Sequence, residues 1–163
     1  MSASTDQSKP TTVYDEILKN WLGHRHLTRR VIDAFPEKDL FSFSIGGMRP
    51  FAEIVKEFLA IGVPGLKQLV TGEVLNYVED FRDFKTKQEI LGAWDEATEA
   101  IRALWKQIPP ERFSETFNLF GQYEDTVLHN IQYFIDNEIH HRGQGYVYLR
   151  ALGIEPPPFW ERG

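Results

Sequence analysis

The segment from Asp136 to Gln144 places an acid, an imidazole and a guanidinium on one side of an expected helix. At about 100° per residue, Glu138, His141 and Arg142 fall within the apolar sector of this helix. That sector is marked by Val127, Leu128, Ile131, Phe134, Ile135, Leu149 and Leu152, whereas His129 and His140 fall outside it. Burying a charge is costly unless the charge is paired, hydrogen-bonded or bound. These side chains therefore predict either a buried ion-pair network or a binding site.

Two spacings within this segment carry the chemistry. Glu138 and Arg142 are four residues apart, in the order that favours an ion pair along a helix. Alternatively, the Glu138–Arg142 pair only fixes the packing of the helices and has no chemical role. Asn137 lies one turn before His141, so an amide and an imidazole share a face. A histidine on an apolar face is either a hydrogen-bonded core residue or a metal ligand, and both interpretations stay open.

Two residues on other expected helices could complete a site with His141. Glu57 lies on the flank of an apolar stripe, four residues after Glu53. It belongs either to an exposed acidic edge or, if the second and fourth helices are neighbours, to a partial site for a divalent cation with His141. His24 lies in the apolar stripe of the first helix. It is expected to line the same cavity or to be a buried, hydrogen-bonded residue.

Amphipathic helices must position these residues, and two of them are expected in the first half of the chain. The first covers about residues 12–34 and ends before Pro36, because proline cannot continue a helix. The second begins after Pro50, where the missing N–H of proline is tolerated. It is expected to bend or break at residues 62–65, which hold two glycines and a proline, before it resumes.

Two further helices are expected in the second half. The third begins at the capping box of residues 86–89 and ends at Pro109. Residues 111–123 lack a clean period and predict a packed connector that can include a short strand. The fourth covers about residues 125–152, with Gly153 as a left-handed cap. The sequence thus predicts an all-α fold, a four-helix bundle with a long connector between the third and fourth helices.

Composition sets the class of protein. A length of 163 residues suits one domain over residues 1–163, with residues 1–10 expected to be flexible. The net charge of −6 argues against sequence-independent binding to nucleic acid, and the absence of cysteine excludes disulfides and thiolate metal sites. The N-terminal segment lacks the apolar core of a signal peptide, and no apolar run approaches the ~20 residues of a membrane span. We expect a soluble, cytoplasmic protein that binds neither membranes nor nucleic acid.

Two blocks of the sequence resemble the DinB-like superfamily of small four-helix bundles. Residues 48–57, MRPFAEIVKE, are similar to the start of the family's second helix. Residues 137–157, from NEIHHRGQ to the GIEPP that follows the helix, are similar to its fourth helix and exit. With the order of elements and the length, the resemblance covers nearly the whole chain.

The resemblance implies a divalent metal site, held in relatives by one histidine of the second helix and two histidines of the fourth. The matching positions in this sequence are Glu57, Asn137 and His141, so one histidine remains. A carboxylate, an amide and an imidazole should bind nickel, zinc or manganese more weakly than three imidazoles. We expect either a metal-free site joined by hydrogen bonds, or weak binding of a harder cation with help from His24 or water.

The resemblance also implies a homodimer and leaves two functions open. One is a metal-dependent transferase or hydrolase that acts on a small molecule between the helices, with Glu138 and Arg142 supporting the ligands. The other is a non-catalytic dimeric bundle that binds a small ligand or a protein partner. Phe159 and Trp160 could bind such a partner, although we expect them to dock onto the end of the bundle.

Overall fold

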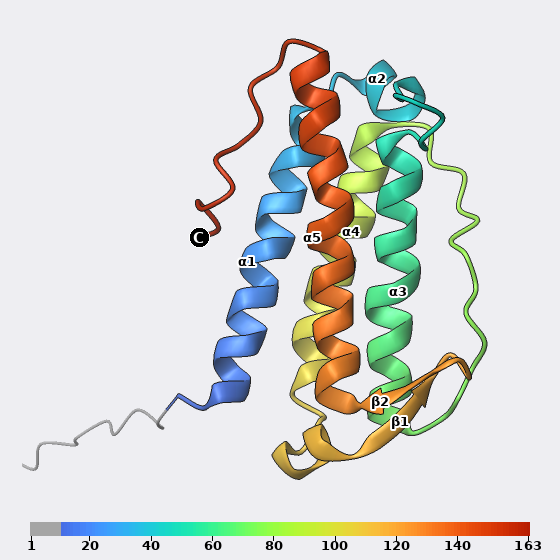
Figure 1. Cartoon of the computed structure of the whole chain (residues 1–163), viewed down its shortest axis with the longest axis vertical. Coiled ribbons are helices and arrows are strands. Elements are labelled where there is room, and N and C mark those ends of the chain that lie inside the picture. Colours follow the sequence, from blue (N-terminus) through green and yellow to red (C-terminus); the bar gives the residue numbers. More distant parts are fainter. Residues whose placement is uncertain (1–10) are drawn as a thin grey trace, which may run out of the picture.

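The computed structural model describes residues 11–163; the expectation that residues 1–10 are flexible lies outside the described residues. Four long helices pack side by side (Figure 1). They are α1 (Val13–Ala34), α3 (Phe51–Thr71), α4 (Lys87–Trp105) and α5 (Val127–Ala151). A short helix, α2 (Glu37–Ser42), follows α1 and was not predicted. The predicted helical bundle is confirmed, with the addition of α2 and a small hairpin.

The helix ends follow their local sequence signals. α1 and α4 begin at capping boxes, in which the side chains of Thr12 and Thr86 accept hydrogen bonds from backbone N–H groups three residues later. After α5, Gly153 has a φ of 76°, and the N–H of Ile154 donates to the carbonyl of Leu149 at 2.9 Å. The left-handed cap predicted for the fourth helix is therefore confirmed.

The second long helix does not break at residues 62–65, because α3 runs from Phe51 to Thr71 with Pro64 inside it. Proline removes one backbone hydrogen bond. The helix is nevertheless held by tight packing at Gly65, where a Cβ would lie 2.6 Å from the ring of Phe134 on α5. Burial of Ile61 and Leu66 on either side of Pro64 outweighs the single lost bond.

Two connections leave the bundle and later supply the walls of a pocket. Residues 72–86 have no regular structure and run along the outside of α3 before α4 begins (Figure 1). The connector after α4 holds a 3₁₀ turn (Pro110–Ser114) and an antiparallel hairpin of β1 (Thr116–Leu119) and β2 (Tyr123–Thr126). The third long helix, α4, ends at Trp105, whereas the sequence predicted that it would end at Pro109. The fourth begins at Val127, because the residues before it pair with β1.

The core consists of two apolar clusters separated by polar side chains. One cluster is built around Phe35, Phe51, Trp94 and Tyr148, and the other around Trp21, Leu69, Phe120 and Phe134. Along α1, α4 and α5 the residues between these clusters are polar: His24, Arg25, Thr28, Thr98, Glu138 and Arg142. We call these six residues the polar layer.

Among residues 11–163, none of the helices has both the length and the apolarity that a membrane span requires.

The segment after α5 turns back along the bundle beside α1 (Figure 1). The guanidinium of Arg30 donates to the carbonyl of Glu161 at 2.8 Å, and Arg162 lies against Gly23, where a Cβ would be 3.2 Å away. The side chains of Phe159 and Trp160 are 65% and 68% exposed. The expectation that these two rings dock onto the end of the bundle is wrong, because the backbone of the tail and Arg162 make the contacts.

Candidate functional site

The three positions that match the metal ligands of relatives lie together between α3 and α5. The side-chain amide of Asn137 donates to Oε1 of Glu57 at 3.0 Å, and Nε2 of His141 lies 3.2 Å from the same oxygen. On the other carboxylate oxygen, the guanidinium of Arg49 donates to Oε2 at 2.5 Å. We call Arg49, Glu57, Asn137 and His141 the Glu57 cluster. Arg49 precedes α3 and was not among the predicted site residues.

The charges in this cluster follow from burial and hydrogen bonding. Burial alone would raise the pKa of Glu57, but hydrogen bonds from Asn137 and Arg49 hold that pKa below its usual value. Burial lowers the pKa of His141, although the charge of Glu57 opposes this shift. Glu57 is therefore a carboxylate and His141 a neutral imidazole near neutral pH. The side-chain amide of Gln144 lies 3.0 Å from Nδ1 of His141, while Nε2 of the same ring faces Glu57.

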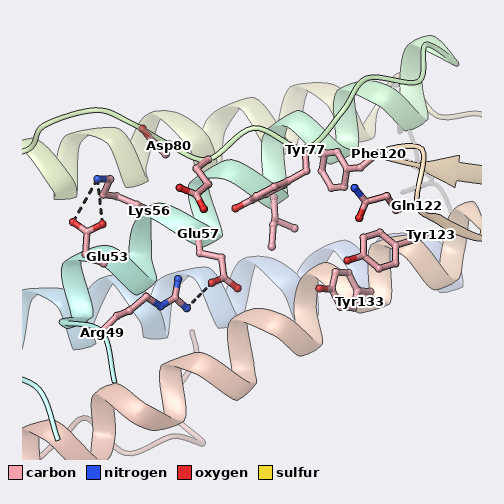
Figure 2. A pocket seen from close by; sticks show the side chains of 12 residues that line it. Arg49, Glu53, Lys56, Glu57, Tyr77, Asp80, Phe120, Gln122, Tyr123 and Tyr133 are labelled. Carbon is pink, nitrogen blue, oxygen red and sulfur yellow. Dashed lines mark hydrogen bonds and ion pairs between the residues drawn. The ribbon is translucent and has the colours of Figure 1, made fainter. Parts of the chain in front are cut away.

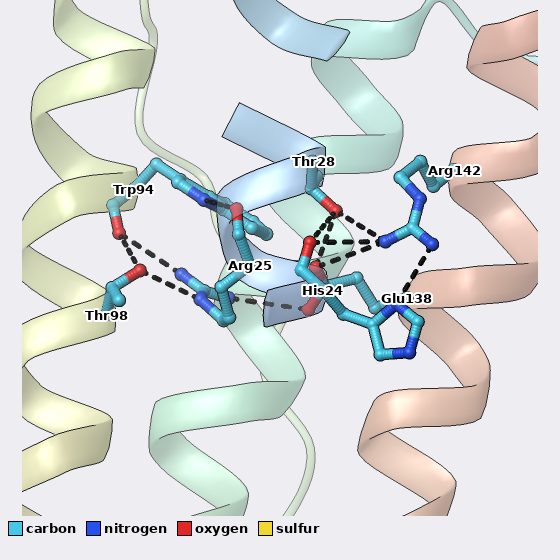
Figure 3. Close-up of polar contacts among 7 residues, drawn as sticks. All are labelled: His24, Arg25, Thr28, Trp94, Thr98, Glu138 and Arg142. Atoms are coloured by element: carbon cyan, nitrogen blue, oxygen red, sulfur yellow. Dashed lines mark hydrogen bonds and ion pairs between the residues drawn. The ribbon is translucent and has the colours of Figure 1, made fainter. Parts of the chain in front are cut away.

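The other predicted residues form part of the polar layer (Figure 3). Glu138 and Arg142 are 2% and 5% exposed, so both are buried, as the sequence predicted. Glu138 accepts a hydrogen bond from the hydroxyl of Thr28 at 2.5 Å. The guanidinium of Arg142 lies 4.0 Å from Glu138, at the outer limit of an ion pair, and the guanidinium of Arg25 is nearer at 3.8 Å. Glu138 thus joins α1 to α5 through several partners.

Arg25 is a residue that the sequence interpretation missed. It is 2% exposed, and its guanidinium lies 3.5 Å from the centre of the Trp94 ring. It also donates to the hydroxyl of Thr98 at 2.9 Å and to the carbonyl of Trp94 at 3.1 Å. Burial lowers the pKa of Arg25 to about 10, which leaves it cationic near neutral pH. Its place four residues after the buried Trp21 was the signal that could have identified it.

His24 belongs to the polar layer and contacts none of the Glu57 cluster. Its Nδ1 lies 3.1 Å from the guanidinium of Arg142, and its Nε2 lies 2.8 Å from that of Arg162. Guanidinium groups only donate, and a neutral imidazole has one acceptor nitrogen, so only one of these contacts is a full hydrogen bond. Burial, together with the charges of the two arginines, lowers the pKa of His24 to about 4. His24 is therefore neutral near neutral pH and holds the tail against α1.

A pocket of about 400 Å³ opens beside Glu57 (Figure 2). Its walls come from four parts of the chain: α3 with the residue before it, segment 72–86, the hairpin and α5. The lining residues are Arg49, Glu53, Lys56, Glu57, Ile61, Tyr77, Glu79, Asp80, Phe120, Gln122, Tyr123 and Tyr133. Only Glu57 among them was a predicted site residue, because the aromatic ones lie on segments that showed no periodic pattern or on the outer face of α5.

The aromatic lining forms two pairs. Tyr77 and Phe120 meet edge to face with ring centres 5.5 Å apart, and Tyr123 and Tyr133 stack with ring centres 6.0 Å apart. Figure 2 shows the hydroxyls of the three tyrosines pointing to the side of the pocket where Glu57 lies. Burial and the nearby charge of Glu57 both contribute to a raised pKa for Tyr77 and Tyr133. Their hydroxyls thus stay protonated and can donate to a ligand.

Comparison with known proteins identifies the family. The model of the DinB family matches residues 1–162. The chain belongs to the DinB family. The resemblance predicted from residues 48–57 and 137–157 is therefore confirmed over the whole chain.

Two crystal structures of DinB-like proteins share the fold of this family member. The protein YjoA from Bacillus subtilis, solved at 2.30 Å, matches with a TM-score of 0.72 and 21% identity, covering 91% of this chain and 99% of that chain. A DinB-like protein from Bacillus cereus ATCC 10987 matches with a TM-score of 0.72 and 16% identity, covering 87% and 94%. In sequence, the uncharacterised protein YjoA of Bacillus subtilis strain 168 is 23% identical over 151 residues, 91% of this chain and 96% of that protein.

The Glu57 cluster does not fit the metal that the DinB family resemblance implies. Both oxygens of Glu57 already accept hydrogen bonds, and the two ring nitrogens of His141 face Glu57 and Gln144, so a metal ion could bind here only if these contacts were broken. Arg49 places a permanent positive charge against the carboxylate, which disfavours a divalent metal ion coordinated by Glu57, Asn137 and His141. Within residues 11–163, no three or more histidine, cysteine or carboxylate side chains are arranged to hold a metal ion. The chemistry of the cluster is that of a hydrogen-bonded ion pair.

Proposed function

We propose that this DinB family protein binds a small organic molecule in the pocket beside Glu57, and that the Arg49–Glu57 ion pair stands in for a metal ion. The observation that carries this proposal is the position of Glu57. Its carboxylate accepts hydrogen bonds from Arg49 and Asn137, lies 3.2 Å from Nε2 of His141, and also lines the pocket. The ion pair gives the floor of the pocket a fixed polar group without a metal.

The shape and lining of the pocket support ligand binding. Its volume of about 400 Å³ lies within the ~300–1,000 Å³ that is usual for small-molecule sites. Two aromatic pairs provide flat apolar surface, and the tyrosine hydroxyls with Arg49, Glu57 and Gln122 provide groups that can orient a ligand. Such a mixture of aromatic walls and a few polar groups is typical of binding sites.

The contacts of His141 support binding without catalysis. One ring nitrogen faces Glu57 and the other faces Gln144, so neither is free to take a proton from a bound molecule. The raised pKa values of Tyr77 and Tyr133 leave their hydroxyls poor nucleophiles near neutral pH. The polar layer is buried away from the pocket and supplies no group to its lining.

A thermal-shift screen of small aromatic and amine compounds, run with and without EDTA, tests this proposal. We expect compounds that raise the melting temperature equally in both conditions. Gln122→Trp, which puts a bulky ring at an exposed lining position, should abolish these shifts. The control Gln88→Trp, at an exposed position of α4 outside the pocket, should leave them intact. Shifts that vanish with EDTA, or shifts that Gln122→Trp leaves unchanged, would contradict the proposal.

A further inference from the structure

The pocket beside Glu57 carries more negative than positive charge. Its lining holds four carboxylates, Glu53, Glu57, Glu79 and Asp80, and two cations, Arg49 and Lys56. Each lining cation is already paired with a lining carboxylate: Lys56 with Glu53 at 3.3 Å, and Arg49 with Glu57 at 2.5 Å. A bound anion would therefore meet two cations that are already engaged with lining carboxylates.

The two remaining carboxylates differ in their partners. Asp80 is paired at 2.5 Å with Arg82, which does not line the pocket. Glu79 has no hydrogen-bond or salt-bridge partner within residues 11–163, and its charge lies close enough to raise the pKa of Tyr77. Glu79 is thus an exposed carboxyl group in the lining of the pocket that a ligand cation could pair with.

The aromatic lining suits the same class of ligand. Cations bind over the faces of tyrosine and phenylalanine rings, within about 6 Å of the ring centre. Tyr77, Phe120, Tyr123 and Tyr133 surround one part of the pocket, and the Glu57 charge acts on the phenols of Tyr77 and Tyr133 (Figure 2). Ring faces and carboxylates therefore occur together, and both attract positive charge.

Glu57 itself retains room for one more donor. A carboxylate offers about four lone-pair positions; Arg49 and Asn137 donate to two of them, and Nε2 of His141 lies beside a third at 3.2 Å. The side chain of Glu57 is 18% exposed and lines the pocket, so a ligand can approach the carboxylate from the pocket side. An N–H of a ligand could take the fourth position.

We infer that the ligand of this pocket is a small organic cation, with an ammonium group held between Glu57, Glu79 and the ring faces of Tyr77 and Tyr133. This inference rests on the proposed function, namely that the pocket binds a small molecule. The class includes amines with an aromatic or aliphatic body that fits a cavity of about 400 Å³. Neutral and acidic molecules of the same shape are disfavoured, because they leave Glu79 without a partner.

Three probes of the same shape and different charge test this inference: phenethylammonium, 2-phenylethanol and phenylacetate. Isothermal titration calorimetry near neutral pH should show that the ammonium binds at least about tenfold more tightly than the alcohol. Phenylacetate should bind most weakly. Binding of the ammonium no tighter than that of the alcohol or the acetate would overturn the inference, as would a failure of the ammonium to bind at all.

Two pairs of variants show whether the named groups hold the cation. Glu79→Gln should weaken ammonium binding about threefold, as expected for an exposed charge pair, whereas Glu99→Gln, which removes a charge from the outside of α4, should not. Tyr133→Phe keeps the ring face and should keep most of the affinity, whereas Tyr133→Leu should lose it. Equal losses in Glu79→Gln and Glu99→Gln, or in both Tyr133 variants, would contradict the inference.

The two proposals fail in different ways. If phenylacetate or the alcohol binds best and Gln122→Trp blocks that binding, the pocket is a ligand site and only the cationic class is wrong. If Gln122→Trp leaves the binding of every probe unchanged, the proposed function fails together with the inference. Circular dichroism of each variant confirms that a loss of binding is not a loss of fold.

Discussion

The guanidinium of Arg49 donates to Oε2 of Glu57 at 2.5 Å, on the carboxylate oxygen that Asn137 and His141 leave free. This contact joins the segment before α3 to the second turn of that helix, and the Asn137 and His141 contacts join the same carboxylate to α5. The cluster therefore carries its own positive charge. In an ordinary metal site of this family the ion would supply that charge.

The ionisation of His141 reports directly on this cluster. Because the charge of Arg49 lowers the pKa of His141 and the charge of Glu57 raises it, the two neutral variants should act in opposite directions. Arg49→Gln should raise the pKa of His141, and Glu57→Gln should lower it further. Histidine NMR titrations measure both, and the titration of His24 should stay the same in each variant. Shifts of His141 in the same direction would show that the contacts are misassigned.

The buried carboxylate of Glu138 should be important for stability. Glu138→Ala leaves Arg25 and Arg142 buried without their shared partner, which should lower the free energy of unfolding by about 3–5 kcal/mol. Asp95→Ala breaks the half-exposed Arg29–Asp95 pair between α1 and α4 and should cost less than about 1 kcal/mol. Urea unfolding measures both values. Equal costs in the two variants would mean that the polar layer contributes no more than a surface pair.

Two glycines of α5 offer a matched test of helix packing. A Cβ at Gly145 would lie 2.6 Å from the ring of Phe51, whereas a Cβ at Gly143 would have no neighbour within 4 Å. Gly145→Ala should destabilise the protein by about 1–3 kcal/mol through overpacking. Gly143→Ala should stabilise it by up to about 1 kcal/mol, because alanine is the better helix former. Thermal melts that rank the two variants in the reverse order would contradict the packing of α3 against α5.

The neutral state of His24 makes stability depend on pH. The unfolded chain binds a proton at His24 near pH 6.5, but the folded chain does so only at about 4, so protonation favours unfolding between these values. The contribution of neutral His24 to the free energy of unfolding is fully present above pH 6.5 and is lost as the pH falls to about 4. The loss amounts to about 3 kcal/mol. Comparing the wild type with His24→Gln isolates this histidine from the carboxylates. Parallel stability curves for the two proteins over this range would show that His24 is not held neutral.

The fold could largely be predicted from the sequence, because residues near the helix ends show where the helices start and stop. The capping box at Thr86 and the left-handed Gly153 lie where the sequence places them. The break expected at Pro64 was wrong, because a contact between Gly65 and Phe134, far apart in the chain, outweighs the local signal. Tertiary contacts of this kind cannot be read from periodicity.

The site could be predicted only in part, for the same physical reason. Helical periodicity placed His141 on an apolar face and Glu57 on the flank of another, and the structure brings Nε2 of His141 to 3.2 Å from Oε1 of Glu57. Arg49 lies outside the helix, and the reach of its side chain to Glu57 is set by the fold of the segment before α3. Tyr77 lies on residues 72–86, which have no repeating geometry from which a direction could be derived. The aromatic walls therefore required the structure.

The central claim, that Arg49 stands in for a metal, is tested most directly by the metal content of the untagged protein. The protein is dialysed against Ni²⁺ and Zn²⁺ in parallel with the double variant Glu57→His/Asn137→His, which restores three imidazoles around His141. Elemental analysis should find about one equivalent in the double variant and only a small fraction of an equivalent in the wild type. Stoichiometric metal in the wild type, lost in His141→Ala, would contradict the claim.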